Sequence, residues 1–174
     1  DYIGSTNSRS SYDDATLLTQ LIKESVLARV PKDSQFGLTL SGGVDSTIMA
    51  YVLALNQEKF ETFTNIFSTF DLAHVNESEQ VQNTVDELNI KANFVELAYY
   101  DPDHILQIYE KKIRNYECPI SDIGLSGYTV YESIRKNGFK VVLEGQGADE
   151  IFGGYEAYRS PFTIMRSNLI TSFY

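Results

Sequence analysis

The sequence has little cysteine and few basic residues, and it lacks any long hydrophobic run. A single cysteine, Cys118, among 174 residues excludes an internal disulfide framework and fits a reducing compartment such as the cytoplasm. Fourteen Lys and Arg stand against 24 Asp and Glu, a net charge of −10 with no basic cluster, so we expect no nucleic-acid partner. No apolar run approaches the roughly 18 residues of a membrane span and no signal-peptide pattern opens the chain, so we expect no membrane partner.

The hydrophobic residues that are present follow an alternation of strands and helices. They make up 43% of the chain, enough for one globular domain with a real core. Short β-branched and aromatic runs predict four strands, at 36–40, 61–67, 92–97 and 139–143. Helical spacing predicts helices capped by Asp13 and Asn76, others starting at about Ser46 and at Pro102, and one over 125–136. This alternation predicts an α/β fold, a parallel twisted sheet with helices on both faces.

The composition changes at both ends of the chain. Residues 1–12 are rich in Ser, Asn and Gly, and we expect them to form a linker. Residues 13–161 hold the predicted strands and helices and form the predicted domain. Residues 162–174 are apolar and end abruptly, which predicts the start of a helical segment that is truncated here. The first residue is Asp1 rather than Met, so we expect a processed or excised chain.

A loop that reads SGGVDS, residues 41–46, directly follows the first predicted strand. Adjacent glycines let a backbone turn tightly and approach an anion, and free N–H groups at the start of the next helix point at phosphates. The hydroxyls of Ser41 and Ser46 can donate to phosphate oxygens, and Asp45 can hold Mg²⁺. No lysine follows the glycines, so this is not a Walker A loop. The alternative is an ordinary strand-to-helix turn.

A second motif follows the last predicted strand, at residues 144–155, which read EGQGADEIFGGY. The loop at 41–46 resembles the PP-loop of the N-type ATP pyrophosphatases. The second stretch resembles the second signature of the asparagine synthetase family, usually GEG(S/A)DE(L/V)FGGY. The two motifs have the family's order and about its spacing, and the resemblance covers roughly residues 13–161. It implies the adenine-nucleotide α-hydrolase-like fold of the PP-loop ATP pyrophosphatases.

The resemblance assigns ATP and Mg²⁺ to residues of both motifs. The implied nucleotide-binding residues are Leu40, Ser41, Gly42, Gly43, Val44, Asp45, Ser46, Gly145 and Gly147. Asp45 and Asp149 are the implied Mg²⁺ ligands, and the alternative for each is a helix N-cap. If strands 36–40 and 139–143 are neighbours, both carboxylates reach one site at the carboxyl edge of the sheet.

Gln146 and Glu150 are the implied catalytic residues. The family has Glu where this chain has Gln146, beside the activated carboxylate. A glutamine can hydrogen-bond but cannot act as a base or carry charge. The change speaks against aspartate as the acceptor, unless it is a drift without chemical consequence. Glu150 is either a partner of the metal ligands or a first-turn charge that the helix dipole favours.

The resemblance implies an ATP-dependent carbon–nitrogen ligase of the glutamine-hydrolysing asparagine synthase type, a cytoplasmic enzyme of amino-acid biosynthesis. It would adenylate a small-molecule carboxylate and release pyrophosphate, and ammonia from a glutaminase domain absent from this chain would then form the amide. One alternative is a related PP-loop ligase or ring-closing synthetase with another acceptor. The other is an ATP-binding domain without catalysis, because the family places a phosphate-contacting lysine beyond the last residue of this chain. The oligomeric state stays open, a homo-oligomer included.

Overall fold

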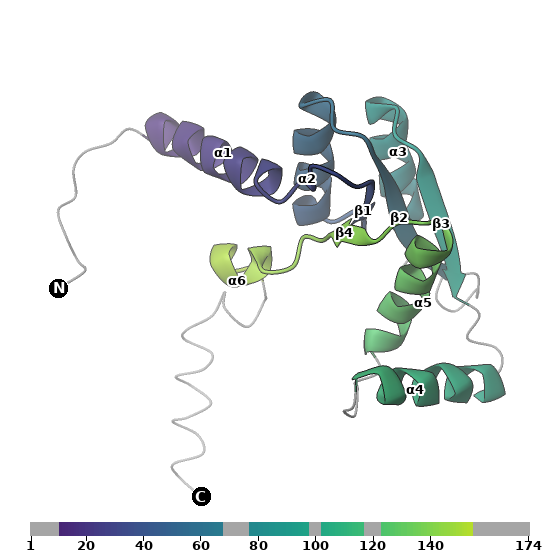
Figure 1. The fold of residues 1–174 in the computed structure, drawn as a ribbon. Coiled ribbons are helices and arrows are strands. Elements are labelled where there is room, and N and C mark those ends of the chain that lie inside the picture. The colour runs from purple at the N-terminus through teal and green to yellow at the C-terminus, as the bar shows by residue number, and fades with distance from the viewer. Residues whose placement is uncertain (1–10, 68–76, 98–101, 117–122, 155–174) are drawn as a thin grey trace, which may run out of the picture. The chain divides into compact units, whose positions relative to one another are not determined.

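The computed structural model describes residues 11–67, 77–97, 102–116 and 123–154 (Figure 1). The chain divides into two compact units, Asp1–Leu143 and Glu144–Tyr174. The predicted linker lies outside the described residues except for its last two positions, and the predicted helical segment at 162–174 lies wholly outside them. None of the helices in the described ranges combines the length and the apolar character that crossing a membrane requires.

The first unit is built on a parallel four-stranded sheet whose strand order is β3-β2-β1-β4. The strands are β1 (Phe36–Thr39), β2 (Phe60–Phe67), β3 (Ala92–Leu97) and β4 (Val141–Leu143). Phe36 pairs with both Phe60 of β2 and Val141 of β4, so β1 is the central strand. The chain moves outward from β1 to β3 and then returns to the other side of β1, which places a topological switch point between β1 and β4. The predicted parallel sheet is confirmed, and its first and last strands are neighbours.

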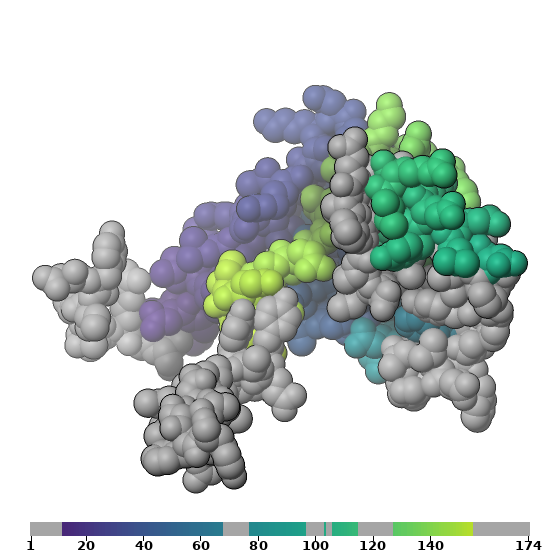
Figure 2. Space-filling model, turned by 90° about the horizontal axis from the view of Figure 1, so that it is seen from below, coloured from purple at the N-terminus to yellow at the C-terminus, as the bar shows by residue number. Residues whose placement is uncertain are grey.

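Helices cover both faces of the sheet, as predicted (Figure 1). One face carries α1 (Ser11–Leu27), α2 (Val44–Leu55) and α3 (Ser78–Leu88), and the other carries α5 (Ile123–Lys136). Helix α4 (Pro102–Tyr116) packs on α5, and its own outer side is exposed in the space-filling view (Figure 2). The α/β fold of the sequence prediction is therefore the fold of this unit.

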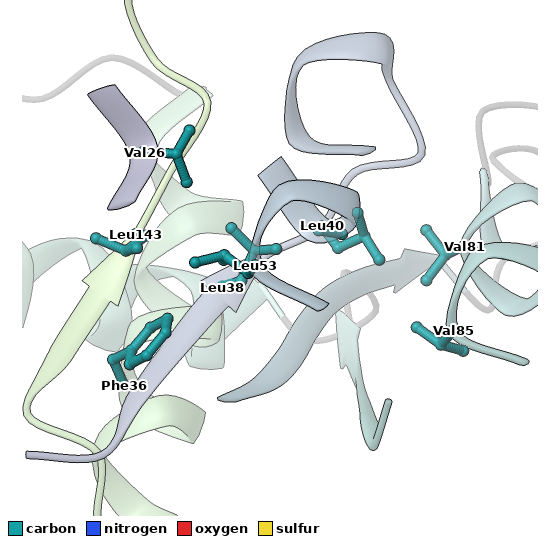
Figure 3. Packing of buried hydrophobic residues seen from close by; sticks show 9 residues of the cluster. Val26, Phe36, Leu38, Leu40, Leu53, Val81, Val85 and Leu143 are labelled. Atoms are coloured by element: carbon teal, nitrogen blue, oxygen red, sulfur yellow. The ribbon is translucent and has the colours of Figure 1, made fainter. Parts of the chain in front are cut away.

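The larger hydrophobic cluster lies between the sheet and helices α1 to α3 (Figure 3). Side chains of a strand alternate between faces, so Phe36, Leu38 and Leu40 point to the same side. Leu38 and Leu53 of α2 are fully buried, and burial of each stabilises the fold by about 2 kcal/mol. The cluster holds β1 against α2, and the loop between them is therefore anchored at both ends. Its buried members are Val26, Phe36, Leu38, Leu40, Ala50, Leu53, Val81, Val85 and Leu143.

A smaller cluster fills the face under α5. Phe63 of β2 meets Phe139 edge to face, with ring centroids 5.5 Å apart, and Val130 and Ile134 of α5 complete the cluster. Outside it, the Lys111 ammonium pairs with Glu132 and lies 5.6 Å from the centroid of the Tyr128 ring. These contacts join α4 to α5.

Helix α1 packs on the core only through its C-terminal turns. Val26 is buried and Ile22 is partly buried, but Leu17, Leu18 and Leu21 are 40%, 43% and 53% exposed. The 17-residue helix runs past the elements that it contacts (Figure 1), so its first turns have no sheet beneath them. It begins at Ser11, so the predicted cap Asp13 lies inside its first turn.

Glu61 on β2 provides a test of stability against pH. Its carboxylate accepts hydrogen bonds from Lys91 Nζ at 3.0 Å and Asn93 Nδ2 at 2.9 Å. Burial alone would raise the pKa of Glu61, but the hydrogen bonds from Asn93 and Lys91 and the Lys91 charge outweigh it, and the pKa is lowered. A lowered folded-state pKa contributes stability above the unfolded pKa of about 4.3, and that stability is lost as the pH falls through the folded value.

We therefore expect Glu61→Gln to lower the free energy of unfolding by about 1 kcal/mol at pH 7, and the deficit to shrink below about pH 4. Urea unfolding at pH 7 and pH 3.5 measures both values. Glu96→Gln, on an exposed residue of the neighbouring strand, is the control and should change little at either pH. An equal deficit of the Glu61 variant at both pH values would contradict the assignment.

Candidate nucleotide site

The loop at 41–46 leaves the sheet from a fixed point at the end of β1. The N–H of Leu40 donates to the Phe63 carbonyl at 3.1 Å, and the Leu40 carbonyl accepts from the buried Thr64 hydroxyl at 2.7 Å. Leu40 itself is 1% exposed and belongs to the larger cluster. The role of Thr64 was not predicted. The sequence does not distinguish it from Thr62, the other threonine of the same strand.

The two serines of the loop bond to each other and to the loop backbone. Their hydroxyl oxygens are 3.1 Å apart, and Ser46 Oγ also accepts from the Ser41 N–H at 3.2 Å. The Ser46 hydroxyl donates to the Gly43 carbonyl at 3.3 Å, and the Gly43 N–H donates to Ser41 Oγ at 3.2 Å. Ser46 is 5% exposed. Both hydroxyls brace the loop here, a function that the prediction of phosphate donors did not include.

Glycine is required at position 42 for two independent reasons. Its φ of +84° is a left-handed conformation that side chains with a Cβ rarely adopt. A Cβ built there would also lie 2.9 Å from Glu77 Cβ and 3.2 Å from the Glu77 carbonyl oxygen, at the start of α3. The loop thus passes directly against α3, which the sequence alone did not indicate.

The first turn of α2 directly follows the two glycines of this loop. The helix begins at Val44, two residues before the predicted start, and its N-cap Gly43 makes no side-chain capping bond. The first backbone bond back to the cap comes from the Thr47 N–H to the Gly43 carbonyl at 3.1 Å. The N–H groups of the preceding helical residues have no acceptor within the helix, and the helix dipole adds positive potential there. Such a helix end attracts phosphate groups.

Asp45 is the second residue of α2, so the alternative that it caps the helix is wrong. An N-cap residue has a non-helical backbone and precedes the first turn, and Gly43 occupies that position. The half-buried Asp45 carboxylate stands in the first turn, beside the backbone donors.

The second motif forms a short helix, α6 (Ala148–Phe152), in the second unit. Gly147 is its N-cap with a φ of +95°, so a left-handed backbone explains the glycine there. Asp149 is the second residue of α6, so it is not an N-cap either. The N–H groups of Gly153 and Gly154 both donate to the Asp149 carbonyl, at 2.9 and 3.0 Å, and end the helix. A Cβ at Gly154 would overlap the Asp149 carboxylate, so this glycine makes room for that side chain.

The remaining predicted site residues lie in the same short segment. Gln146 and Glu150 are exposed, and the Gly145 carbonyl accepts from the Ala148 N–H at 3.4 Å. The structure thus brings residues 40–46 together in the first unit and residues 145–150 together in the second. Within the described residues, no three His, Cys, Asp or Glu form a group that could hold a metal ion. A cation at this loop would need ligands from its substrate as well.

An open depression of about 490 Å³ lies at the other end of β1. It is lined by residues 31–35 and 57–59, which precede β1 and β2, and by Phe36, the first residue of β1. Because the loop at 41–46 follows β1, the depression is at the amino edge of the sheet and the loop is at the carboxyl edge. It is not part of the predicted site.

A strand, a Gly-Gly loop and a helix start at the carboxyl edge of a parallel sheet form the candidate site of this α/β protein. Its family is shown by comparison: the asparagine synthase profile matches residues 17–171, and the chain belongs to that family. A Methanocaldococcus jannaschii protein, provisionally named a glutamine-hydrolysing asparagine synthetase, is 31% identical over 146 residues, which are 83% of this chain and 26% of that protein.

Two other relatives show that the family carries different names. Asparagine synthetase 1 of Bacillus subtilis, named as glutamine-hydrolysing, is 27% identical over 82% of this chain and 22% of its own length. The amidase chyE of Penicillium rubens is 27% identical over 90% of this chain and 25% of its own length. The chain thus spans about a quarter of the length of these relatives.

Among solved structures, an NMN synthetase from Francisella tularensis is similar over 76% of this chain and 53% of its own chain, at 15% identity. Its TM-score of 0.42 is too low to support a comparison of sites.

Proposed function

We propose that this chain is the ATP-binding part of an ATP-dependent, amide-forming synthetase that adenylates a carboxylate. The observation that carries the proposal is the loop at 41–46, in which a left-handed Gly42 leads into the start of α2, whose N-cap Gly43 makes no side-chain capping bond. Membership in the asparagine synthase family supports the reaction class.

The proposed binding residues follow from the donors of the loop. The N–H groups of the first turn of α2 hold the pyrophosphate part of ATP, and Leu40, Gly42 and Gly43 keep the backbone close to it.

We propose Asp45 and Asp149 as the carboxylates that hold Mg²⁺. Mg²⁺ prefers one or two carboxylates plus phosphate oxygens, which fits a site without a three-residue protein cluster. When bound, it neutralises negative charge on the phosphates.

The proposed reaction has two steps. A carboxylate oxygen of the substrate forms a bond to the α-phosphorus, the bond from that phosphorus to the bridging oxygen breaks, and pyrophosphate leaves with its electron pair. Ammonia then attacks the acyl carbon, loses a proton, and AMP leaves. The loop contributes to catalysis electrostatically, because its fixed N–H dipoles stabilise charge on the departing pyrophosphate. Ammonia would come from a glutaminase domain outside this chain, and Glu150 would support the metal ligands.

The acceptor that we propose is a carboxylate other than aspartate. The sequence has Gln146 where the resembled asparagine synthetases have Glu, and an uncharged amide cannot serve as a base. A ring-closing synthetase is the second candidate, and the same replacement of Glu by Gln146 favours it. Action in the cytoplasm, and in amino-acid biosynthesis, belongs to this proposal as well.

The test is carboxylate-dependent exchange of labelled pyrophosphate into Mg·ATP, with a panel of carboxylates that includes aspartate. We expect exchange with at least one carboxylate, and none without a carboxylate or without Mg²⁺. Tight binding of Mg·ATP without exchange on any carboxylate would instead support an ATP-binding domain that does not catalyse. The absence of any ATP binding by the folded chain would overturn the proposal.

A further inference from the structure

The carbonyl group of Leu40 accepts its hydrogen bond from a side chain, where a parallel sheet would supply a backbone donor. β1 pairs with β2 as far as Thr39, and the Leu40 N–H still donates to the Phe63 carbonyl at 3.1 Å. In a continued parallel ladder the Leu40 carbonyl would next accept from the Asn65 N–H. It accepts instead from the Thr64 hydroxyl at 2.7 Å, and the described residues give it no other donor. The chain therefore turns away from the sheet here with its carbonyl group still bonded.

The peptide unit that contains this carbonyl is also held at its other end. The Leu40 carbonyl and the Ser41 N–H belong to one planar unit, so fixing one group orients the other. The Ser41 N–H donates to Ser46 Oγ at 3.2 Å, and the Ser46 hydroxyl donates to the Gly43 carbonyl at 3.3 Å. A chain of hydrogen bonds thus runs from Thr64 of β2 through this peptide unit to the loop and the first turn of α2.

Burial makes this chain of hydrogen bonds depend on the Thr64 hydroxyl. Leu40 and Thr64 are 1% and 4% exposed, so water is not a ready substitute for the donor. A buried carbonyl that loses its donor is unfavourable, and rotation of the peptide unit is one way for it to reach another. That rotation exchanges the directions of the carbonyl and the Ser41 N–H. A carbonyl oxygen, which carries partial negative charge, would then point at the loop in place of an N–H.

We infer that Thr64 is a positioning residue for the loop at 41–46: its hydroxyl orients the peptide unit between Leu40 and Ser41, and through it the backbone that receives the phosphates. Thr64 acts through Leu40 and needs no contact with the nucleotide. The inference rests on the proposed function, because it requires phosphate to bind at this loop. It goes beyond that function by assigning a part to a residue of β2, outside both sequence motifs.

The test compares Thr64→Val with Thr64→Ser by calorimetric titration with Mg·ATP and with inorganic pyrophosphate plus Mg²⁺, at temperatures where every variant is folded. Valine has nearly the shape of threonine without the hydroxyl, and serine keeps the hydroxyl. We expect Thr64→Val to weaken the binding of both ligands by about tenfold, an effect of the size of one hydrogen bond. Thr64→Ser should restore the wild-type affinities to within about threefold, because its hydroxyl can still bond the Leu40 carbonyl.

Thr62→Val is the matched control. Thr62 is a fully buried threonine of the same strand, and its hydroxyl lies 3.5 Å from the Lys91 carbonyl. That carbonyl also accepts from the Thr62 N–H at 2.9 Å, so the substitution leaves it bonded. Both affinities should therefore stay at their wild-type values.

Wild-type affinities in Thr64→Val would overturn the inference, and so would equal losses in Thr62→Val and Thr64→Val. Weak binding by Thr64→Ser as well would assign the effect to the methyl group of threonine and overturn the part given to the hydroxyl. Loss of Mg·ATP affinity with normal pyrophosphate binding would place the effect away from the phosphates and overturn it too. In all these cases wild type binds Mg·ATP and the proposed function stands. Failure of wild type to bind either ligand would count against the proposed function itself.

Discussion

Replacing Gly42 with alanine is expected to weaken nucleotide binding strongly. A non-glycine residue in the left-handed region costs about 1–2 kcal/mol, and the new Cβ would lie 2.9 Å from Glu77 Cβ. Neither the loop nor the start of α3 can remain in place. A displacement of about 1 Å reduces catalysis about a hundredfold in preorganised sites. We therefore expect Mg·ATP affinity in calorimetry to fall by at least about a hundredfold.

Gly138 provides the control for this substitution. Its φ of +86° nearly equals that of Gly42, but a Cβ there would meet no atom within 4 Å. Gly138→Ala should therefore cost only the conformational strain, about 1–2 kcal/mol in urea unfolding, with ATP affinity unchanged. If Gly42→Ala behaves like Gly138→Ala in both measurements, the contact with Glu77 has no part in shaping the site.

Replacing Asp45 with asparagine is expected to remove the Mg²⁺ dependence of ATP binding and to slow pyrophosphate exchange by about a hundredfold or more. Asparagine has nearly the same shape, so the loop should keep its fold while the charge that attracts the cation is lost. The measurement is titration of wild type and variant with α,β-methylene-ATP, with and without Mg²⁺.

Glu79 is a matched control, because it is the second residue of α3 as Asp45 is of α2. Both carboxylates interact favourably with a helix dipole, so Glu79→Gln and Asp45→Asn should each lower stability by about 0.3–1 kcal/mol. Only the Asp45 variant should lose Mg²⁺-dependent binding. If Asp45→Asn binds with the same response to Mg²⁺ as wild type, Asp45 is not a metal ligand.

The strands could be predicted because buried parallel strands are short apolar runs between polar segments. Strand 36–40 was predicted one residue too long, and 139–143 two residues too long. Phe139 explains the second error: its side chain is buried in the smaller cluster, but its backbone precedes the first paired residue of β4. Hydrophobicity reports burial of the side chain and not pairing of the backbone.

Helix starts were predicted less well, and the candidate site depends on two of them. Capping preferences favour Asp, Asn and Ser over glycine and glutamate, but the caps of α2 and α3 are Gly43 and Glu77. At α2 the Ser41 hydroxyl accepts a hydrogen bond from the Gly43 N–H. The side chain that bonds this backbone donor thus comes from a residue before the N-cap, and capping preferences consider only the N-cap residue itself. The predicted cap Asn76 lies outside the described residues.

The contacts that shape the loop could not be predicted, because they join residues far apart in the chain. The close approach of Gly42 to Glu77 depends on the position of α3. The hydrogen bond from Thr64 to Leu40 depends on the register of β2. The exposed apolar side of α1 was also missed, because helical spacing shows that a face is apolar but not what covers it. Helix α5 ends at Lys136 and turns at Gly138, as predicted, because that stop is encoded locally.

The strand order also determines which strand pairs can form first during folding. β1 pairs with β2 across a single helix, but with β4 only after the chain has passed through α3, α4 and α5. Contacts between distant residues form slowly, and a chain is synthesised from its N-terminus. The Ser-Gly-Gly loop can thus form on β1 and β2 while the ribosome is still adding later segments. Until β4 pairs with it, one edge of β1 remains unpaired. An apolar edge left open in this way is where a nascent chain is most prone to aggregate.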